Sequence, residues 1–473
     1  PTSSVFSVGT YGQVNNNGDT FVAYLFADGD NSAAQIFGDD GDEAIIKCGS
    51  YQSTGNGDEV FVDLGFEPQW VMIKSTTDTN SGYDPYGQPW LMQDIMRGMA
   101  HPSTTNNPSL FANLNGAENS TGTAGWTRAE ATGITIGVAG AINMFNSVQT
   151  YAYIAIRRGP MKEPDAGTDV FSMAQPTSNA PLYKTGKLVD MAFNRQVHTA
   201  ADLYLQTRLF SGNYLRTNTT DATSTDSSSV FDYQTGYYNS SYNDTNAYGW
   251  AFRRFPKVFD HIVYKGTNGG GSASSYVDTY PHNLGVKPEM IIIKATDNTA
   301  YGLNWEVWHT GLLGSIANLA DDSAAANGLS DSATADGVRF RDHSTASVIG
   351  RTNSSHTNSS SHSYIGLLFA SLSGISAVNK YTGTGNDINV TDLGAAARFV
   401  LIKRVDSSGD WYVYDSTRGI VSGNDPYLFI NSNAAQVTNT DYIDPHSSGF
   451  TVTSSAPDAL NASGGTYIYL AFA

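Results

Sequence analysis

Aspartates and tyrosines are the most abundant titratable side chains of this 473-residue sequence. The chain has 36 aspartates, eight glutamates, nine histidines and 27 tyrosines. Two carboxylates can cleave a glycosidic bond, but so many aspartates form pairs that no pair stands out. The histidines lack metal-ligand spacing, and the sequence has no nucleophile elbow, phosphate loop or dinucleotide-binding fingerprint. The sequence therefore predicts that the protein is not an enzyme, and it identifies no catalytic or metal-binding residue.

Five tyrosines in a polar stretch are the candidate ligand-binding residues: Tyr233, Tyr237, Tyr238, Tyr242 and Tyr248. Tyrosine among Ser, Asn and Gly combines a rigid ring with adaptable hydrogen bonding, which is typical of recognition surfaces. Alternatively, these rings pack in half-buried cross-strand pairs, and the sequence favours neither interpretation. A second recognition loop is expected at Asn353–Ser363, where we interpret His356 and His362 as members of a mobile, exposed loop.

An acidic, glycine-rich stretch at residues 29–44, with Asp28 before it, is the candidate calcium site. Clustered aspartate oxygens on a flexible loop are hard ligands that suit Ca²⁺. The spacing does not match an EF-hand loop, which needs a glycine at its turn and a closing glutamate. The sequence favours a solvated connector that its like charges keep extended. No other cofactor is indicated.

The best-patterned polar motif is a tryptophan followed by an aspartate and then by Arg-Gly, and it occurs twice: Trp90, Asp94 and Arg97, then Trp411, Asp415 and Arg418. The tryptophans could stack on sugar rings while the charged groups bind hydroxyls. In the structural interpretation, the tryptophan is buried and the Asp–Arg pair closes a turn. The same residues recur in two places, whereas a binding site is usually elaborated in one copy. The repetition therefore favours the structural interpretation.

The chain is built from diverged repeats. One motif begins with Leu-Gly, continues with an apolar run and ends at a lysine, and it occurs three times: Leu64–Lys74, Leu284–Lys294 and Leu393–Lys403. This pattern predicts a turn that leads into a strand buried on both faces. Apolar closing strands follow downstream, and two of them run into the related sequences Arg157–Pro160 and Arg253–Pro256. That match indicates a fourth, more diverged unit.

Composition sets the fold class. Only 15% of residues are charged, and polarity comes instead from Ser, Thr, Asn, Asp and Gly, which is typical of strands joined by turns. We predict an all-β protein of tandem antiparallel β-sandwiches, jelly-roll or lectin-like. Helix should be limited to a short piece at Leu312–Ala320 or Trp90–Met99. The predicted domains are closing strands of a preceding or complemented unit (1–28), the acidic connector (29–44), sandwich units (45–160, 257–373 and 374–473) and a diverged sandwich unit (161–256).

Charge and cysteine content limit the partners. The net charge of −18 repels phosphate backbones and argues against nucleic-acid binding. No apolar run is long enough to span a bilayer as a helix, so membrane insertion is not expected. The single cysteine, Cys48, cannot form an intramolecular disulfide, which fits folding in a reducing cytoplasm.

Five stretches carry a resemblance to a known group of proteins: Ile45–Tyr51, Leu64–Lys74, Tyr151–Pro160, Gly249–Arg254 and His282–Val286 with Pro288-Glu289. They resemble a recurrent module of tailed-phage virion proteins, particularly those of marine and cyanobacterial phages, which are surface or tail-fibre-like structural proteins. The resemblance covers most of the chain and is poor at residues 320–363. It implies a place on the virion surface after folding in the host bacterial cytoplasm, and it supplies no catalytic residues.

The repeats and the resemblance together predict a non-enzymatic, fibre-like adhesin that contacts the host surface. One alternative is a decoration or cement protein of the capsid or tail, and a weaker one is an envelope-glycan depolymerase. The expected partners are other virion proteins and a host-surface glycan. We also expect a homo-oligomer, with a trimer favoured.

Overall fold

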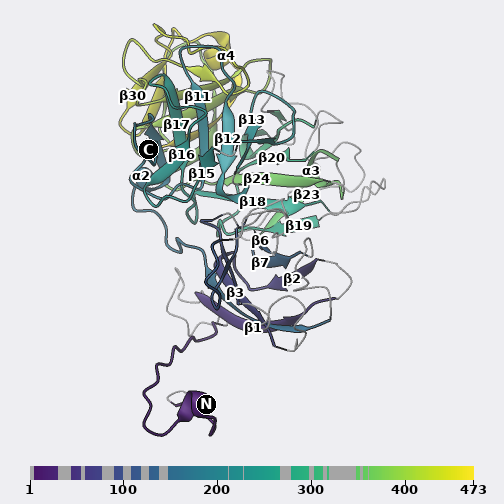
Figure 1. Ribbon diagram of the computed structural model, residues 1–473. Coiled ribbons are helices and arrows are strands. Elements are labelled where there is room, and N and C mark those ends of the chain that lie inside the picture. Colours follow the sequence, from purple (N-terminus) through teal and green to yellow (C-terminus); the bar gives the residue numbers. More distant parts are fainter. Residues whose placement is uncertain are drawn as a thin grey trace.

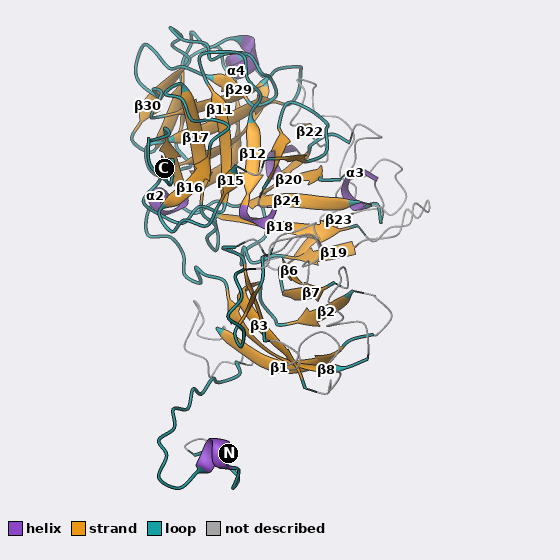
Figure 2. Ribbon diagram, in the orientation of Figure 1, coloured by secondary structure: helices purple, strands orange, loops and turns teal. Residues whose placement is uncertain are grey.

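In the computed structural model, the regular secondary structure consists almost entirely of antiparallel strands, which are joined by loops (Figures 1 and 2). It describes residues 5–29, 44–54, 59–76, 90–97, 99, 108–118, 127–137, 148–210, 212–226, 228–266, 278–297, 303–312, 317–318, 348–351, 355–360 and 362–473. The prediction of an all-β protein of sandwich-like antiparallel sheets with little helix is confirmed.

Unit 1 consists of a large sheet with strand order β1-β8-β3-β4-β5 and a small sheet with order β2-β7-β6. Its strands are β1 (Ile46–Gln52), β2 (Val60–Asp63), β3 (Pro68–Ser75), β4 (Leu91–Asp94), β5 (Leu110–Phe111), β6 (Thr127–Glu130), β7 (Gly133–Ile136) and β8 (Thr150–Arg157).

Unit 2 has a large sheet with order β14-β13-β12-β11-β17-β9 and a small sheet with order β10-β16-β15. Its strands are β9 (Phe171–Ala174), β10 (Tyr183–Lys184), β11 (Met191–Gln196), β12 (Tyr204–Thr207), β13 (Asn213–Arg216), β14 (Ser224–Thr225), β15 (Ser229–Val230), β16 (Gly236–Asn239) and β17 (Ala247–Phe252).

Unit 3 has a large sheet with order β18-β24-β20-β21-β22 and a two-stranded sheet, β19-β23. Its strands are β18 (Phe259–Lys265), β19 (Asp278–Pro281), β20 (Met290–Ala295), β21 (Glu306–His309), β22 (Ala317–Asn318), β23 (Val348–Arg351) and β24 (Ser363–Phe369).

Unit 4 has a large sheet with order β25-β32-β27-β28-β29 and a small sheet with order β26-β31-β30. Its strands are β25 (Ser376–Thr382), β26 (Ile388–Val390), β27 (Phe399–Arg404), β28 (Trp411–Asp415), β29 (Leu428–Phe429), β30 (Ile443–His446), β31 (Gly449–Val452) and β32 (Thr466–Phe472).

The four large sheets share one topology. In each, the last strand of the unit lies between the first strand and a central strand, and the next two strands follow outward. Unit 2 follows the same order and adds β14 at one edge. The central strands of units 1, 3 and 4 are the Leu-Gly motif strands β3, β20 and β27, so these three segments hold equivalent positions. The domain boundaries stay a prediction, because the sheets locate strands and do not delimit units that fold alone.

A glycine turn introduces the central strand in three of the units. Gly65, Gly285 and Gly394 have φ of +74°, +73° and +76°. A side chain is strained in this left-handed region, whereas glycine is not. The Leu-Gly pair of the motif is therefore explained by the backbone conformation that the turn requires.

Among the described residues, helices are confined to single turns: α1 (Gly12–Asn15), α2 (Gly167–Val170), α3 (Ser355–Asn358), α4 (Asp458–Asn461) and the 3₁₀ turns η2 (Arg208–Phe210) and η3 (Thr310–Leu312). The helix predicted at Trp90–Met99 is wrong, because Leu91–Asp94 pair with β3 as strand β4. At Leu312–Ala320, the described residues are the end of η3 and the short strand β22.

Two kinds of core hold the units together. Each unit packs one face of its large sheet toward its small sheet and so has a core of its own. The opposite faces of the large sheets of units 2, 3 and 4 pack on one another and build one shared core. Ring pairs join every two of these units, with centroid distances of 5.3, 5.8 and 6.3 Å: Phe171–Phe399, Phe252–Phe259 and Phe369–Phe472. We call units 2–4 the three-unit body.

The N-terminal segment projects away from unit 1 (Figure 1). Between residues 5 and 29 only α1 is regular, and the stretch Phe21–Ala27 forms no strand in the described part of the chain. Its side chains are apolar and exposed, with Val22 at 78% and Tyr24 at 83%. That residues 1–28 pair with another unit or a neighbouring molecule stays a prediction.

Candidate functional site

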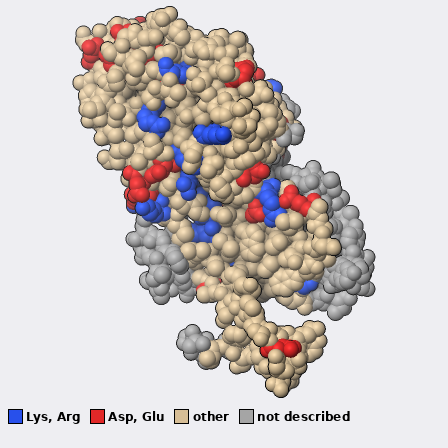
Figure 3. Space-filling model, turned by 60° about the vertical axis from the view of Figure 1, so that its left-hand side comes forward, with Lys and Arg blue, Asp and Glu red and all other residues tan. Residues whose placement is uncertain are grey.

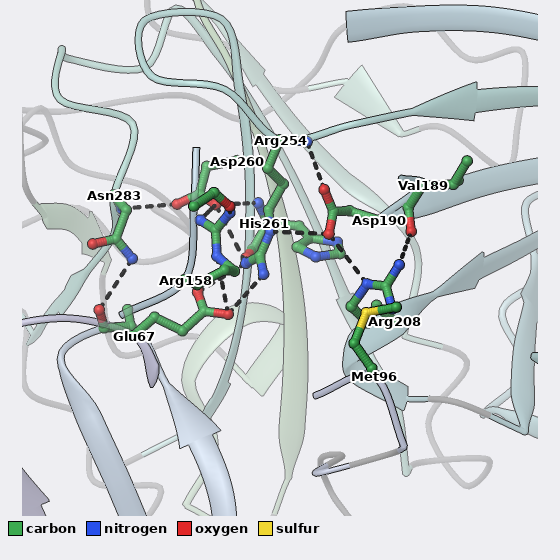
Figure 4. Close-up of polar contacts among 12 residues, drawn as sticks. Glu67, Met96, Arg158, Val189, Asp190, Arg208, Arg254, Asp260, His261 and Asn283 are labelled. Atoms are coloured by element: carbon green, nitrogen blue, oxygen red, sulfur yellow. Dashed lines mark hydrogen bonds and ion pairs between the residues drawn. The ribbon is translucent and has the colours of Figure 1, made fainter. Parts of the chain in front are cut away.

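The largest group of buried charges lies where units 1, 2 and 3 meet (Figure 4). It contains three arginines, three carboxylates and a histidine: Arg158, Arg208, Arg254, Glu67, Asp190, Asp260 and His261. None of these side chains is more than about one-tenth exposed. We call this group the junction network.

Arg254 is the centre of the junction network. It follows strand β17 of unit 2 and makes a two-point ion pair with Glu67 of unit 1, at 2.7 Å from Nη2 to Oε1 and 2.8 Å from Nη1 to Oε2. Its Nη1 also donates to the carbonyl of His261 in unit 3 at 3.1 Å. Burial would lower the pKa of Arg254, but the carboxylates of Glu67, Asp190 and Asp260 outweigh it and raise the pKa. One guanidinium therefore contacts three units.

Arg158 supplies a second link at the end of unit 1. Its Nε lies 3.3 Å from Oε1 of Glu67, and its Nη2 lies 3.6 Å from Oδ1 of Asp260. Asp260 also accepts the backbone N–H of Asn283 at 2.8 Å, while the amide of Asn283 donates to the carbonyl of Ala131 in unit 1. The Asp260 carboxylate thus connects strand β18 to Arg158, the residue that directly follows the closing strand β8 of unit 1.

Asp190 and Arg208 form the part of the junction network that belongs to unit 2. Arg208 Nε donates to Asp190 Oδ1 at 3.3 Å, and the backbone N–H of Arg254 donates to Asp190 Oδ2 at 2.8 Å. Burial would raise the pKa of Asp190, but the guanidiniums of Arg254 and Arg208 outweigh burial and hold the pKa below its usual value. Arg208 also reaches Met96 of unit 1, with 2.9 Å between Nη1 and Sδ.

His261 lies beside these charges and is fully buried. In the described part of the chain, neither ring nitrogen has a hydrogen-bond partner. Burial, together with the neighbouring guanidiniums, holds the pKa of His261 well below the ordinary 6.5. The imidazole is therefore neutral at physiological pH, and the three arginines balance the three carboxylates.

The junction network has the chemistry of a structural contact between units and not that of a catalytic site. A guanidinium keeps its proton throughout the physiological range and is not a general acid or base. The carboxylates are engaged by arginines and backbone N–H groups, so they are not free to act on a substrate. Paired, hydrogen-bonded charges in a buried position fix a geometry, because breaking one leaves its partner uncompensated. The arrangement therefore fixes unit 1 against units 2 and 3.

The sequence offered one signal for this network. Arg158 and Arg254 are the second arginines of the two related sequences that follow the closing strands of units 1 and 2. Their recurrence identified a repeat boundary, but their partners could not be recognised, since Glu67 and Asp190 are far away along the chain.

Residues 1–160 and 258–473 match a known protein family, described as a domain of unknown function, DUF7483. The chain belongs to this family. No curated protein matches the chain, and no solved structure does. The segment that the DUF7483 match leaves out, 161–257, contains all the strands of unit 2. Arg254, Asp190 and Arg208 of the junction network lie in that segment.

The five candidate tyrosines are divided by the structure. Tyr237 is fully buried, stacks on Tyr183 with 4.8 Å between centroids, and accepts a hydrogen bond from Asn194. Tyr242 is 7% exposed and donates to the carbonyl of Asp202. Both rings are part of the packing of unit 2, which corrects the expectation that they face a ligand.

The other three candidate tyrosines are half-buried. Tyr238 packs against the core of unit 2, and Tyr248 packs against the shared core. Tyr233 is the first residue of the tyrosine-rich stretch 233–248 and is followed by the exposed residues Gln234 and Thr235. The ligand-binding prediction is therefore retained for Tyr233, Tyr238 and Tyr248.

Other tyrosines form a repeated structural pair. The first and last strands of units 1, 3 and 4 place two tyrosines opposite each other, with centroid distances of 5.2, 5.2 and 4.9 Å: Tyr51–Tyr151, Tyr264–Tyr364 and Tyr381–Tyr467. In unit 4, the hydroxyl of Tyr381 donates to the carbonyl of Leu460 at the single-turn helix α4. The cross-strand interpretation accounts for these rings.

The tryptophan–aspartate–arginine motif closes a turn in both copies. The backbone N–H of Arg97 donates to Asp94 at 2.8 Å, and its Nε donates to the same carboxylate at 2.6 Å. Arg418 and Asp415 repeat both contacts. The structural interpretation, in which the Asp–Arg pair closes a turn and the tryptophan is buried, is therefore correct for the ion pair. It is correct for Trp411, which is 1% exposed, but Trp90 is 41% exposed.

The Ser/Asn tract at 353–363 differs from the exposed loop that we expected. Part of it forms α3, where Thr357 and Asn358 are fully buried and the Tyr264 hydroxyl donates to the Thr357 carbonyl. His356 Nδ1 lies 2.8 Å from Oε1 of the buried Glu306. The prediction of a mobile loop here is wrong for the described residues 355–360, because the polar side chains find partners in unit 3.

The candidate calcium site lies outside the described residues, apart from Asp28, Gly29 and Ala44. Asp28 accepts the backbone N–H of Cys48 and lies 3.7 Å from Lys47 Nζ. Within the described ranges, no group of three His, Cys, Asp or Glu side chains is arranged to hold a metal ion. The helices of those ranges are all too short or too polar to cross a membrane.

Proposed function

We propose that the protein is a non-enzymatic, fibre-like adhesin on the surface of a tailed-phage virion, where it contacts a host-surface glycan. The resemblance of the repeat motifs to phage virion modules supports the location. The junction network and the Asp–Arg turns support a scaffold, since these charged groups hold units and turns together. In this proposal the chain folds in the host bacterial cytoplasm and then assembles with other virion proteins.

The observation that carries the proposal is the low content of charged residues, 15%, in a chain whose polarity comes mainly from Ser, Thr, Asn and Asp. On the face drawn in Figure 3, lysine, arginine, aspartate and glutamate form small separate groups among uncharged residues. Ser, Thr, Asn and Tyr side chains can exchange hydrogen bonds with sugar hydroxyls without neutralising a charge. Each contact of this kind is weak, but many copies on one particle raise avidity by about 10²–10⁴.

A second candidate function is decoration or cementing of the capsid or tail. The observation in its favour is the exposed apolar stretch Phe21–Ala27 of the N-terminal segment. An isolated apolar strand presents a row of unpaired backbone groups and is suited to complete the sheet of a neighbouring protein. A decoration protein would use this stretch as its attachment to the virion.

The test is adsorption of the purified full chain to host cells. We expect saturable binding that the double variant Tyr233→Ala/Tyr238→Ala weakens at least tenfold. The control variant Phe61→Ala, at a 52% exposed position in unit 1, should bind like the wild type. Absence of binding, with the protein seated against the capsid or tail in electron micrographs of the particle, would favour decoration. Release of reducing sugar from host glycan would contradict the non-enzymatic proposal and favour a depolymerase.

A further inference from the structure

Unit 1 has an open sheet face that is equivalent to the faces forming the shared core. The open face is the side of the large sheet turned away from β2-β7-β6. Its apolar side chains come from β1, β8 and β3 and from the start of β4: Ile46, Cys48, Trp70, Met72, Trp90, Met92, Ile154 and Ile156. Trp90 is exposed and Ile154 is buried at 9%, while the other six are half-buried within one chain. Register places them together, since Met72 is opposite both Ile154 and Met92.

In units 2, 3 and 4, the residues at the equivalent register positions of the large sheet are buried in the shared core. Met72 corresponds to Phe193, Ile292 and Leu401, all members of the shared core. The clearest comparison is between tryptophans that precede or begin the equivalent strands. Trp305 and Trp411 are 0% and 1% exposed, whereas Trp90 is 41% exposed. The same apolar face is thus fully buried in units 2–4, whereas in unit 1 most of its side chains are only half-buried.

Polar groups at the rim of this face show the same contrast. In unit 4, the Asp415 and Arg418 side chains are 1% and 2% exposed, and Asp415 accepts the indole N–H of Trp250 from unit 2. In unit 1, the equivalent Asp94 and Arg97 side chains are 16% and 24% exposed. The pair that lies in a seam between units of the three-unit body is therefore at the surface in unit 1.

The connection between units 1 and 2 is longer than the connections within the three-unit body. Residues 253–258 and 370–375 join the closing strand of one unit to the first strand of the next within the three-unit body. The longer segment 158–170 joins unit 1 to unit 2. In Figure 1 the small sheet β2-β7-β6 of unit 1 lies between its large sheet and the three-unit body, so the open face is directed away from that body. Cover for this face must therefore come from outside the three-unit body.

We propose that three copies of this chain associate through the open faces of their unit 1 domains, and that these faces pack as the faces of units 2, 3 and 4 do. Side-chain size supports this arrangement. At the position of Ile156 the other units have the larger residues Phe252, Phe369 and Phe472. At the position of Trp70, which is opposite Ile156, they have the smaller residues Met191, Met290 and Phe399. The smaller Ile156 side chain and the larger Trp70 side chain together preserve the total side-chain volume that fills the centre of a threefold core. The inference does not depend on the proposed host contact.

The mass of the full chain in solution tests this proposal. Sedimentation equilibrium of the wild type should give three times the chain mass of 50.6 kDa. Met72→Asp and Trp90→Asp should give monomers, because each places a charge in the buried centre of the association. Trp90 is already 41% exposed within one chain, so Trp90→Asp leaves folding intact even where Met72→Asp does not. The control Phe61→Asp, at a 52% exposed position of β2 in the small sheet, should remain trimeric.

Cys48 gives a second readout, since it is the only cysteine and lies on the open face. Reaction of the native protein with a maleimide should be at least tenfold slower in the wild type than in Trp90→Asp. A monomeric or dimeric wild type at 10 μM (on the order of common assay concentrations) would overturn the proposal. So would a Trp90→Asp variant that remains trimeric with Cys48 protected.

Discussion

Arg254 holds Glu67 through two parallel hydrogen bonds across the boundary between two units, at 2.7 and 2.8 Å. The two residues are 187 positions apart in sequence, and both are buried. Arg254 thereby links the end of β17 to the residue that precedes the central strand of unit 1. The orientation of unit 1 rests on this pair and on the charges around it.

Glu67→Gln should destabilise the protein by about 3–5 kcal/mol, because it leaves a buried guanidinium without a full counter-charge. The measurement is the free energy of unfolding in urea. The control is Asp165→Asn, which breaks the exposed pair with Lys162 and should change stability by less than about 1 kcal/mol. Equal effects of the two variants would show that the junction network does not hold the units together.

Ile292→Asp should cost several kcal/mol, roughly 3–5, because the carboxylate would lie unpaired in the shared core. Ile292 is 3% exposed and belongs to the central strand β20. Thermal unfolding of this variant should be compared with that of Phe61→Asp, which places the same charge at an exposed strand position. A similar melting temperature for the two would contradict burial of the shared core.

Acid should weaken the seam between units 3 and 4 through His309. Its Nδ1 accepts the backbone N–H of Gly311 at 2.9 Å, and its Nε2 lies 3.3 Å from the carbonyl of Tyr469. Burial is the main cause that lowers the pKa of His309 to about 4; the Tyr469 carbonyl opposes it, and Lys380 adds to it to a smaller degree.

The unfolded chain binds a proton at His309 near pH 6.5, but the folded chain does not until about pH 4. Stability should therefore fall as the pH drops through this window, by roughly 3 kcal/mol in total from this residue. Urea unfolding at pH 7.5, 6.0 and 5.0 measures the loss. His309→Gln should lose less between pH 7.5 and 5.0 than the wild type. The remaining loss should come in part from His261, whose pKa is lowered in the same sense.

Phe21–Ala27 should exchange its amide hydrogens rapidly in the isolated protein and slowly in the assembled virion. In the single chain the stretch forms no strand, and its side chains are exposed. Pairing with a neighbour would protect the backbone N–H groups. Hydrogen exchange followed by mass spectrometry measures both states, with β27 as the protected internal standard. Rapid exchange in the virion as well would show that the stretch does not complete a sheet.

Local signals allowed much of the fold to be predicted. The Leu-Gly pair, the apolar run and the closing lysine lie within eleven successive residues, so their register identified β3, β20 and β27 as related strands. Unit 2 lacks this motif and was related to the others only through the sequence after its closing strand. Its sheet order nevertheless matches theirs. The strand order of the large sheet is therefore kept in a unit that lacks the Leu-Gly turn motif.

The contacts between units could not be predicted in the same way. Trp90 and Trp411 stand in the same motif, yet one is exposed and the other is buried, because their surroundings depend on which sheet faces meet. The junction network presents the same difficulty. Glu67 lies within the motif Leu64–Lys74 and Arg254 within the repeated sequence Arg253–Pro256, but no spacing along the chain connects them. The prediction of an exposed loop at 353–363 is wrong for a related reason. Asn358 is buried because strands that are distant in the sequence pack against it.

The shared core also determines how the gene of this protein can exchange parts with related genes. Units 2, 3 and 4 each place one sheet face against the other two, and their phenylalanines meet at every seam. A recombinant that received only one of these units would bring together surfaces that had not diverged jointly. We therefore expect crossovers to fall in the connector 158–170 and to transfer the three units as a single block. Unit 1 can then be inherited separately, provided that the incoming copy keeps a carboxylate at the position of Glu67.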